Sequence, residues 1–127
     1  MKRCGTCKQE LPCEEFHKNK NAKDGRHFRC KRCESSNQLK RKFGINMDQY
    51  EILLSVQGGG CAICGFKQKH KRLAVDHDHA CCSGDITCGK CVRGLLCEAC
   101  NHMLGKAQDD SDRLRSAADY VDKWRNR

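Results

Sequence analysis

Residues 61–105 read CAICGFKQKHKRLAVDHDHACCSGDITCGKCVRGLLCEACNHMLG, and the expected fold depends chiefly on this segment. One Cys-x-x-Cys pair, Cys61 and Cys64, begins the segment, and another, Cys97 and Cys100, lies near its end. Four thiols arranged as two such pairs are a common ligand set of a tetrahedral structural zinc ion. We therefore expect one zinc ion to join the two ends of the segment.

The chain between these two pairs predicts a small α+β unit. Apolar alternation predicts one strand over residues 73–77, and a second strand is predicted over residues 92–96. Residues 98–104 predict a short helix that Gly105 would end. Because the zinc ligands flank these elements, the zinc would hold the helix and the strands together.

Two side chains that carry hard oxygen atoms meet in this arrangement. Asp76 lies at the end of the first predicted strand, and Asn101 lies in the first turn of the predicted helix. Carboxylate and amide oxygens suit Mg²⁺ or Mn²⁺, whereas thiolates retain zinc. The sequence therefore predicts a catalytic metal, held by Asp76 and Asn101, beside a structural one.

Several motifs in this region carry a resemblance to a known family. CAICG, VDHDH and RGLLCEACN occur in this order, preceded by GINMDQYEILLSVQGGG and followed by HMLG. Over residues 44–124 the chain resembles the recombination endonuclease VII family of phage nucleases, within the wider HNH or ββα-metal superfamily. The resemblance implies two strands and a helix, a four-cysteine zinc site, Mg²⁺ on Asp76 and Asn101, and a histidine general base. It also implies DNA cleavage, with branched junctions and mismatches among the family's substrates.

Histidine suits the task of general base, because hydrolysis of a phosphodiester requires a water molecule to be deprotonated near neutral pH. His77 directly follows Asp76, as the base does in HNH motifs, and is the favoured residue. His79 lies two residues further along the same strand face and is the rival base or a phosphate contact.

The stretch ACCSGDITCGKC, at residues 80–91, departs from a simpler family pattern, in which a short turn would connect the two strands. We expect its four thiols to bind a further zinc ion that pins the loop, with free or reactive thiols as the alternative. His79 could replace one of the thiols as a ligand. The four cysteines are Cys81, Cys82, Cys88 and Cys91.

The N-terminal third carries another cysteine set and most of the positive charge. Cys4, Cys7, Cys30 and Cys33 predict a zinc knuckle or ribbon over residues 1–34. Residues 1–45 hold 13 Lys and Arg against 5 Asp and Glu, within a net charge of +9 for the chain. This end of the molecule is therefore expected to attract a polyanion.

A short basic helix is expected to link this knuckle to the rest of the chain. Residues 35–45 contain a serine that could cap a helix and Gly44, which could end it; a solvated charge run is the alternative. Phosphate contacts of this kind are independent of base sequence. The residues expected to bind DNA are Lys40, Arg41 and Lys42 in this linker, together with Arg93, for which a solvated arginine is the alternative.

Two helices are expected to flank the metal sites in a nuclease domain that spans residues 46–127. Asn46 and Gln49 form a capping-box pattern, and the apolar spacing that follows predicts a helix ending before Gly58. Ser111 is expected to cap a C-terminal helix, which we interpret as a lid with a modest role in the core. Its apolar face would consist of Leu114, Ala117, Ala118, Val121 and Trp124.

The composition explains why metal sites are expected to replace an ordinary core. The chain has 13 cysteines in 127 residues, and its leucine, isoleucine, valine and phenylalanine number only 21. An odd cysteine count, with Cys13 left over, fits a complete disulfide framework poorly. The sequence shows no secretory or membrane-spanning segment, so we expect a cytoplasmic protein, in the host cell if it is phage-encoded, without a membrane partner.

The fold class predicted is a small zinc-stabilised α+β protein, with a ββα-metal (HNH-like) core, an N-terminal zinc knuckle and flanking helices. The function predicted is a metal-dependent DNA endonuclease with about three structural zinc ions and a catalytic Mg²⁺ or Mn²⁺. A non-catalytic zinc-finger DNA-binding or adaptor protein is the alternative, and a redox-sensing thiol protein is a third. Duplex or branched DNA is the expected substrate, with a homodimer and phage DNA-processing proteins as candidate partners.

Overall fold

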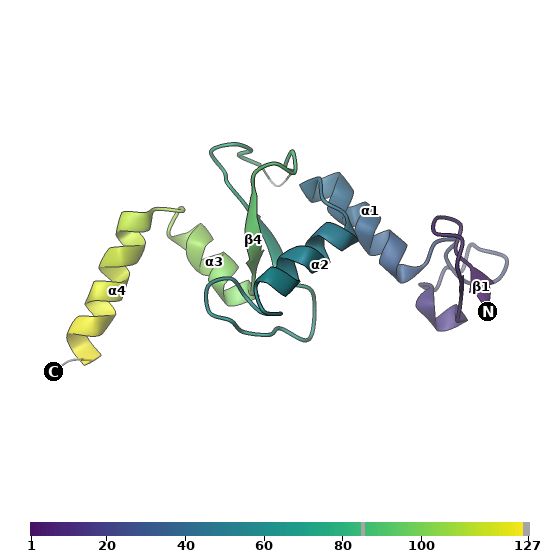
Figure 1. Cartoon of the computed structure of the whole chain (residues 1–127), viewed down its shortest axis with the longest axis horizontal. Coiled ribbons are helices and arrows are strands. Elements are labelled where there is room, and N and C mark those ends of the chain that lie inside the picture. Colours follow the sequence, from purple (N-terminus) through teal and green to yellow (C-terminus); the bar gives the residue numbers. More distant parts are fainter. Residues whose placement is uncertain (85, 126–127) are drawn as a thin grey trace.

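The computed structural model describes residues 1–84 and 86–125 and has an elongated shape, with a small N-terminal module, a central α+β unit and a separate C-terminal helix (Figure 1). The N-terminal module contains β1 (Lys2–Arg3), β2 (Glu10–Leu11) and the 3-10 helix η1 (Cys13–Glu15). The remaining elements in chain order are α1 (Lys31–Phe43), α2 (Met47–Val56), β3 (Ala74–His77), β4 (Val92–Leu96), α3 (Glu98–Lys106) and α4 (Ser111–Arg125).

The central unit contains the two strands and the helix that the sequence predicts. Strands β3 and β4 pair antiparallel, with Ala74 opposite Leu96 and Asp76 opposite Gly94. The register becomes irregular between Asp76 and His77, where β3 ends. Helix α3 packs against both strands. The predicted α+β class is therefore confirmed.

The main core is small and includes sulfur. Its aliphatic side chains come from both strands and from the segment around α1 and α2, and Cys61, Cys97 and Cys100 are buried among them. Thiols therefore occupy volume that larger apolar side chains would otherwise fill. The other buried members are Leu39, Ile45, Tyr50, Leu73, Val75, Leu95 and Leu96.

Helix α2 begins as predicted and is tied to β3. The Asn46 side chain accepts a hydrogen bond from the Gln49 amide, and the Gln49 side chain accepts one from the Asn46 amide, which confirms the capping box. The Tyr50 hydroxyl accepts a hydrogen bond of 2.9 Å from the Leu73 amide. This contact fixes the entry of the chain into β3.

Gln57, directly after α2, forms hydrogen bonds to the backbone of β4. The sequence does not predict this contact. Its Nε2 donates to the carbonyl oxygens of Gly60 and Leu95, and its Oε1 accepts from the Leu95 amide, each at 2.9 Å. One side chain therefore satisfies backbone groups 38 residues away in sequence. The glycine turn is held against the sheet in this way.

We expect Gln57→Ala to lower the free energy of unfolding by about 1–3 kcal/mol, because it takes away the side-chain acceptor of the buried Leu95 amide and one of the two donors to the Leu95 carbonyl oxygen, the other being the Ala62 amide. Urea unfolding followed by circular dichroism measures this change. Ser55→Ala, at an exposed position two residues earlier, is the matched control and should change the value by less than about 0.5 kcal/mol. Equal effects of the two substitutions would contradict the role given to Gln57.

Two of the predicted helix bounds are wrong. Helix α1 begins at Lys31 rather than Ser35, because the extended backbone of Cys30 occupies the N-cap position and no serine caps the helix. Its predicted end is confirmed, since Gly44 adopts a left-handed conformation with φ of 71°. Helix α3 continues through Gly105 to Lys106, so this glycine does not end the helix.

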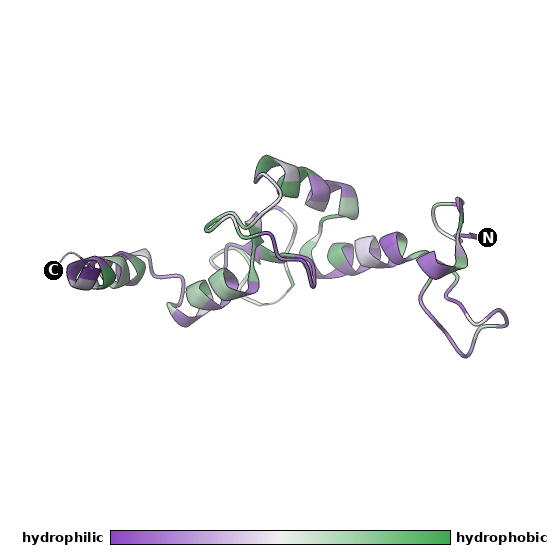
Figure 2. Ribbon diagram, turned by 90° about the horizontal axis from the view of Figure 1, so that it is seen from below, coloured by the Kyte–Doolittle hydropathy of each residue, from purple (hydrophilic) through white to green (hydrophobic). Residues whose placement is uncertain are grey.

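The predicted role of the C-terminal helix in the core is also wrong. None of the described residues of α4 is buried, and Figures 1 and 2 show the helix projecting away from the central unit. Its N-terminus is capped by Asp110, whose Oδ1 accepts hydrogen bonds from the amides of Asp112 and Arg113, while Ser111 is the first helical residue. Helical periodicity thus predicted the element but not its packing, because the pattern shows that one face is apolar and not how deeply that face is buried.

None of the helices in residues 1–84 and 86–125 has both the length and the apolar character that crossing a membrane requires.

Candidate active site

The paired cysteines gather into three groups of four, as predicted. In each group the Sγ atoms all lie within 4.8 Å of one another, and none of the thirteen cysteines forms a disulfide. Four thiols at this spacing fit tetrahedral zinc coordination. Cluster 1 contains Cys4, Cys7, Cys30 and Cys33, cluster 2 contains Cys61, Cys64, Cys97 and Cys100, and cluster 3 contains Cys81, Cys82, Cys88 and Cys91.

Each cluster contains one thiol that ionises readily. Burial raises the pKa of Cys4 and of Cys61, but backbone amides directed at the sulfurs outweigh this effect and lower each pKa to about 6. In cluster 3 the backbone amide of Lys90 is the main cause that lowers the pKa of Cys88 to about 6. Because the thiolate is the form that binds metal, these residues are suited to the first step of metal capture.

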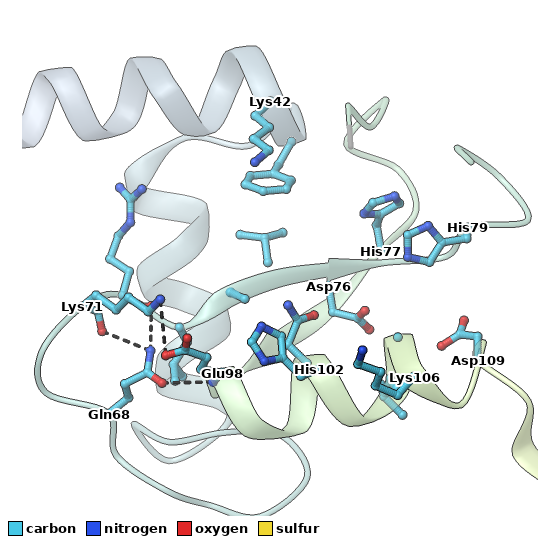
Figure 3. A pocket seen from close by; sticks show the side chains of 18 of the residues that line it. Lys42, Gln68, Lys71, Asp76, His77, His79, Glu98, His102, Lys106 and Asp109 are labelled. Carbon is cyan, nitrogen blue, oxygen red and sulfur yellow. Dashed lines mark hydrogen bonds and ion pairs between the residues drawn. The ribbon is translucent and has the colours of Figure 1, made fainter. Parts of the chain in front are cut away.

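A cleft of about 970 Å³ lies beside cluster 2, between β3, α3 and the end of α1. Asp76 and Asn101, which the sequence predicts as partners, both line it. Figure 3 shows Asp76 pointing toward α3, from which His102 and Lys106 project. The tertiary structure therefore brings the oxygen-bearing side chains of β3 and α3 to one cavity.

His77 and His79 also line the cleft and lie side by side at the end of β3, with ring centroids 4.4 Å apart (Figure 3). Their environments differ, because His77 is only 5% exposed whereas His79 is exposed. The Nε2 atom of His77 lies 3.0 Å from the carbonyl oxygens of Cys82 and Gly84. Since a carbonyl oxygen only accepts, Nε2 carries the proton, and in the neutral ring Nδ1 carries the lone pair.

Arg93, from β4, joins Asp76 to a carboxylate that the sequence did not single out for this site. Its guanidinium donates to both carboxylate oxygens of Asp76, at 2.8 and 3.1 Å, and to both of Asp109, at 2.9 and 3.0 Å. These bonds raise the pKa of Arg93, and the bonds from Arg93 lower the pKa of Asp109. Arg93, expected to contact DNA, thus has its charge compensated by two carboxylates in this structure.

The backbone after α3 places Asp109 at the cleft. Gln108 and Asp109 both adopt left-handed conformations, with φ of 56° and 58°, which non-glycine residues rarely do. The reversal directs the Asp109 side chain back to Arg93. The acidic residues around the start of α4 could have pointed to a carboxylate at the cleft. Such a run is equally typical of a helix N-terminus, where negative charge is favourable.

The predicted DNA-binding lysines and arginine of α1 are only partly brought to this site. Lys40, Arg41 and Lys42 are exposed on the last turn of the helix, and of these Lys42 lines the cleft. Lys71 and Lys106 also line it, although no sequence motif pointed to them. The cleft therefore combines three lysines with the carboxylates around Arg93.

The chain matches one protein family and two phage proteins. Residues 36–123 match the family described as recombination endonuclease VII. The chain is 39% identical over 102 residues to the gene 59 protein of Mycobacterium phage D29, and 39% identical over 100 residues to the gene 59 protein of Mycobacterium phage L5. These matches cover 77% and 76% of this chain but only 57% and 56% of the phage proteins. No solved structure gives a significant match.

Proposed function

The chain belongs to the recombination endonuclease VII family, and from this premise we propose that it is a metal-dependent endonuclease that hydrolyses phosphodiester bonds in DNA. The observation that carries the proposal is the shared cleft of Asp76, His77 and Asn101 beside a tetracysteine cluster. A protein that only binds DNA has no need for hard metal ligands next to a histidine whose tautomer is set.

The donor set at the cleft fits a divalent cation. Asp76 and Asn101 offer oxygen atoms of the kind that Mg²⁺ and Mn²⁺ prefer, in a cavity large enough to admit a phosphate and water. A cation bound there would offset the negative charge that builds on the phosphate during hydrolysis. Asp76 would then share its carboxylate between the cation and Arg93, and Asp109 would retain its own bonds to the guanidinium.

His77 is the proposed general base. The carbonyl oxygens of Cys82 and Gly84 hold its Nε2–H, which leaves Nδ1 to accept the proton of the attacking water. His79 is exposed beside it and is the proposed phosphate contact or alternative base. Lys42, Lys71 and Lys106 would attract the DNA backbone to the cleft.

The chain is proposed to consist of a zinc knuckle, a linker and a nuclease domain. We assign β3, β4 and α3 to a ββα-metal core, cluster 1 to a zinc knuckle at residues 1–34, and residues 35–45 to a basic linker, with residues 46–127 as the nuclease domain. Zinc is the proposed occupant of all three clusters. Duplex or branched DNA is the proposed substrate, and a second copy of the chain and phage DNA-processing proteins are the proposed partners.

Incubation of the purified protein with supercoiled plasmid and with a four-way DNA junction tests the proposal. We expect nicked plasmid or cleaved junction when Mg²⁺ or Mn²⁺ is present, and intact DNA when the divalent cation is omitted. EDTA should also abolish cleavage, but EDTA extracts zinc as well. Omission of the divalent cation is therefore the more specific test. Native mass spectrometry of the cation-free sample confirms that zinc is retained.

The same assay separates the alternatives. A non-catalytic zinc-finger protein would shift the DNA in a gel without cutting it under either condition. A redox-sensing protein would lose zinc and form disulfides under mild oxidation, with no response to Mg²⁺. Either outcome would overturn the nuclease assignment.

A further inference from the structure

Cluster 3 lies on the loop between β3 and β4, and we propose that zinc bound there positions His77 and fixes its tautomer. This inference rests on the proposed role of His77 as the base, but it concerns a loop in which the chain departs from the simpler family pattern. The loop comprises residues 78–91, of which 78–84 and 86–91 are described. His77 itself is the last residue of β3.

The four thiols of cluster 3 are arranged for a single ion. The Sγ atoms of Cys81 and Cys88 lie 3.8 Å apart, and all four Sγ atoms fall within 4.8 Å of one another. The Cys88 amide donates to the Cys82 sulfur at 3.4 Å, as backbone amides do around thiolates in zinc knuckles. Two thiols therefore come from each end of the loop, and one zinc ion would close it.

Apart from backbone hydrogen bonds around Asp78 and at Thr87, little else in the loop holds its shape. Among the described residues of the loop none belongs to a helix or strand, and only Thr87 is buried. Cys81 and Cys88 are exposed, and Gly84 and Gly89 add backbone freedom. Closing such a loop costs conformational entropy that few apolar contacts offset, so its order depends on the metal.

The loop makes direct contact with the proposed base. The carbonyl oxygens of Cys82, a member of the cluster, and of Gly84 both lie 3.0 Å from Nε2 of His77. These two contacts keep the proton on Nε2 and orient the ring. Without the zinc the carbonyl oxygens would no longer be held in place, and the ring could exchange tautomers and lose the lone pair directed at water.

The other end of the loop is braced against the basic helix α1. The Thr87 amide donates to the carbonyl oxygen of Lys42 at 2.9 Å, and the Thr87 hydroxyl lies 2.6 Å from the sulfur of Cys91. Gly44 and Gly89 pack so closely that a Cβ atom on Gly44 would lie 2.8 Å from the Gly89 backbone. The loop that carries cluster 3 therefore contacts both Lys42 and His77, which line the cleft.

Clusters 1 and 2 differ from cluster 3 in their burial. Cys4 and Cys30 are buried in the N-terminal module, and three thiols of cluster 2 are part of the main core. In cluster 3 every thiol is exposed or only partly buried. Loss of zinc from cluster 3 should therefore leave the core folded and act on the loop and on the side chains that the loop contacts, His77 above all.

The substitution Cys88→Ser tests this inference, because it removes an exposed ligand that does not itself contact His77. We expect native mass spectrometry to show two zinc ions in place of three, with thermal unfolding of the core unchanged. Long-range ¹H–¹⁵N correlation spectra should show His77 as a single Nε2–H tautomer in the wild type and as a mixture in the variant. Plasmid nicking should fall roughly 10- to 100-fold, as when an orienting partner of a histidine is lost.

Cys88→His is the rescue variant, since three cysteines and one histidine also bind zinc, and it should restore three zinc ions and the single tautomer. Cys13→Ser, at an exposed thiol outside the clusters, should leave every measurement unchanged. A wild type with two zinc ions, or a single Nε2–H tautomer in zinc-depleted Cys88→Ser, would overturn the inference. If the wild type shows three zinc ions and the fixed tautomer but never cuts DNA, the proposed function fails and the zinc–histidine coupling stands.

Discussion

His77→Ala is expected to lower the rate of plasmid nicking by about 10²- to 10⁴-fold, the contribution that a general base makes to catalysis. The ring of His77 is buried, and its Nε2–H is held by two carbonyl oxygens, so its Nδ1 atom is the one prepared to accept a proton. Single-turnover nicking with saturating Mg²⁺ measures the chemical step without the contribution of DNA binding.

His79→Ala is the decisive comparison, because the two rings are in contact and either could be the base. We expect this variant to lose much less activity than His77→Ala, since the exposed His79 ring makes no comparable pair of bonds among the hydrogen bonds found for the described residues. His70→Ala, at an exposed histidine that does not line the cleft, is the control for general effects. A larger loss for His79→Ala than for His77→Ala would reverse the assignment.

Zinc content and thermal unfolding must accompany these measurements. His77 is buried, so its replacement could also loosen the loop of cluster 3. Retention of three zinc ions and of the unfolding midpoint in His77→Ala would attribute the loss of activity to the missing base. A variant that loses zinc would instead assign His77 a structural role.

Cys97→Ser is expected to unfold the central unit. Cys97 is a member of cluster 2, is 3% exposed within the main core, and accepts a hydrogen bond from the Cys100 amide at the N-cap of α3. Serine is a good N-cap residue, so the substitution preserves capping and removes the thiolate. The change therefore isolates the contribution of the metal site and of the buried sulfur.

The size of the expected loss of stability follows from the free energy of zinc binding. Structural zinc contributes about 10–16 kcal/mol in zinc-finger peptides, which is comparable to the whole stability of a small domain, about 5–15 kcal/mol. We expect Cys97→Ser to lose the zinc of cluster 2, much of the helical circular-dichroism signal and the cooperative thermal transition. Cys13→Ser should retain all three, because Cys13 is exposed and lies outside the clusters. A cooperative transition of unchanged midpoint in Cys97→Ser would contradict a structural role for this site.

Most of the local architecture could be predicted because it depends on neighbours in the sequence. The capping box of Asn46 and Gln49, the helix end at Gly44 and the two strands β3 and β4 all follow from short-range patterns. The grouping of twelve cysteines into three clusters also follows, since Cys-x-x-Cys spacing constrains which thiols can share an ion. Errors occurred at helix ends: Cys30 occupies the N-cap position of α1 ahead of the predicted serine, and α3 continues one residue beyond Gly105.

Long-range polar contacts escaped prediction. Gln57 reaches Leu95 across 38 residues, and Arg93 reaches Asp109 across 16. Neither contact has a local pattern, because a side chain can satisfy any backbone group or carboxylate that the fold brings near it. The apolar face of α4 is the opposite case. Its helical periodicity is clear in the sequence, but the sequence does not show that none of its described residues is buried.

The available chemistry can be recognised in the sequence: which thiols pair, which oxygen-bearing side chains flank a histidine, and which end of the chain is basic. Ligand type and spacing are properties of the chain, so they can be recognised before folding. Which of these groups already have hydrogen-bond partners is visible only in the folded chain. Asp76 and Asp109 share Arg93, and the loop of cluster 3 supplies two carbonyl oxygens to His77. Hydrogen bonds depend on distance and angle to within a few tenths of an ångström, and only the folded backbone sets these.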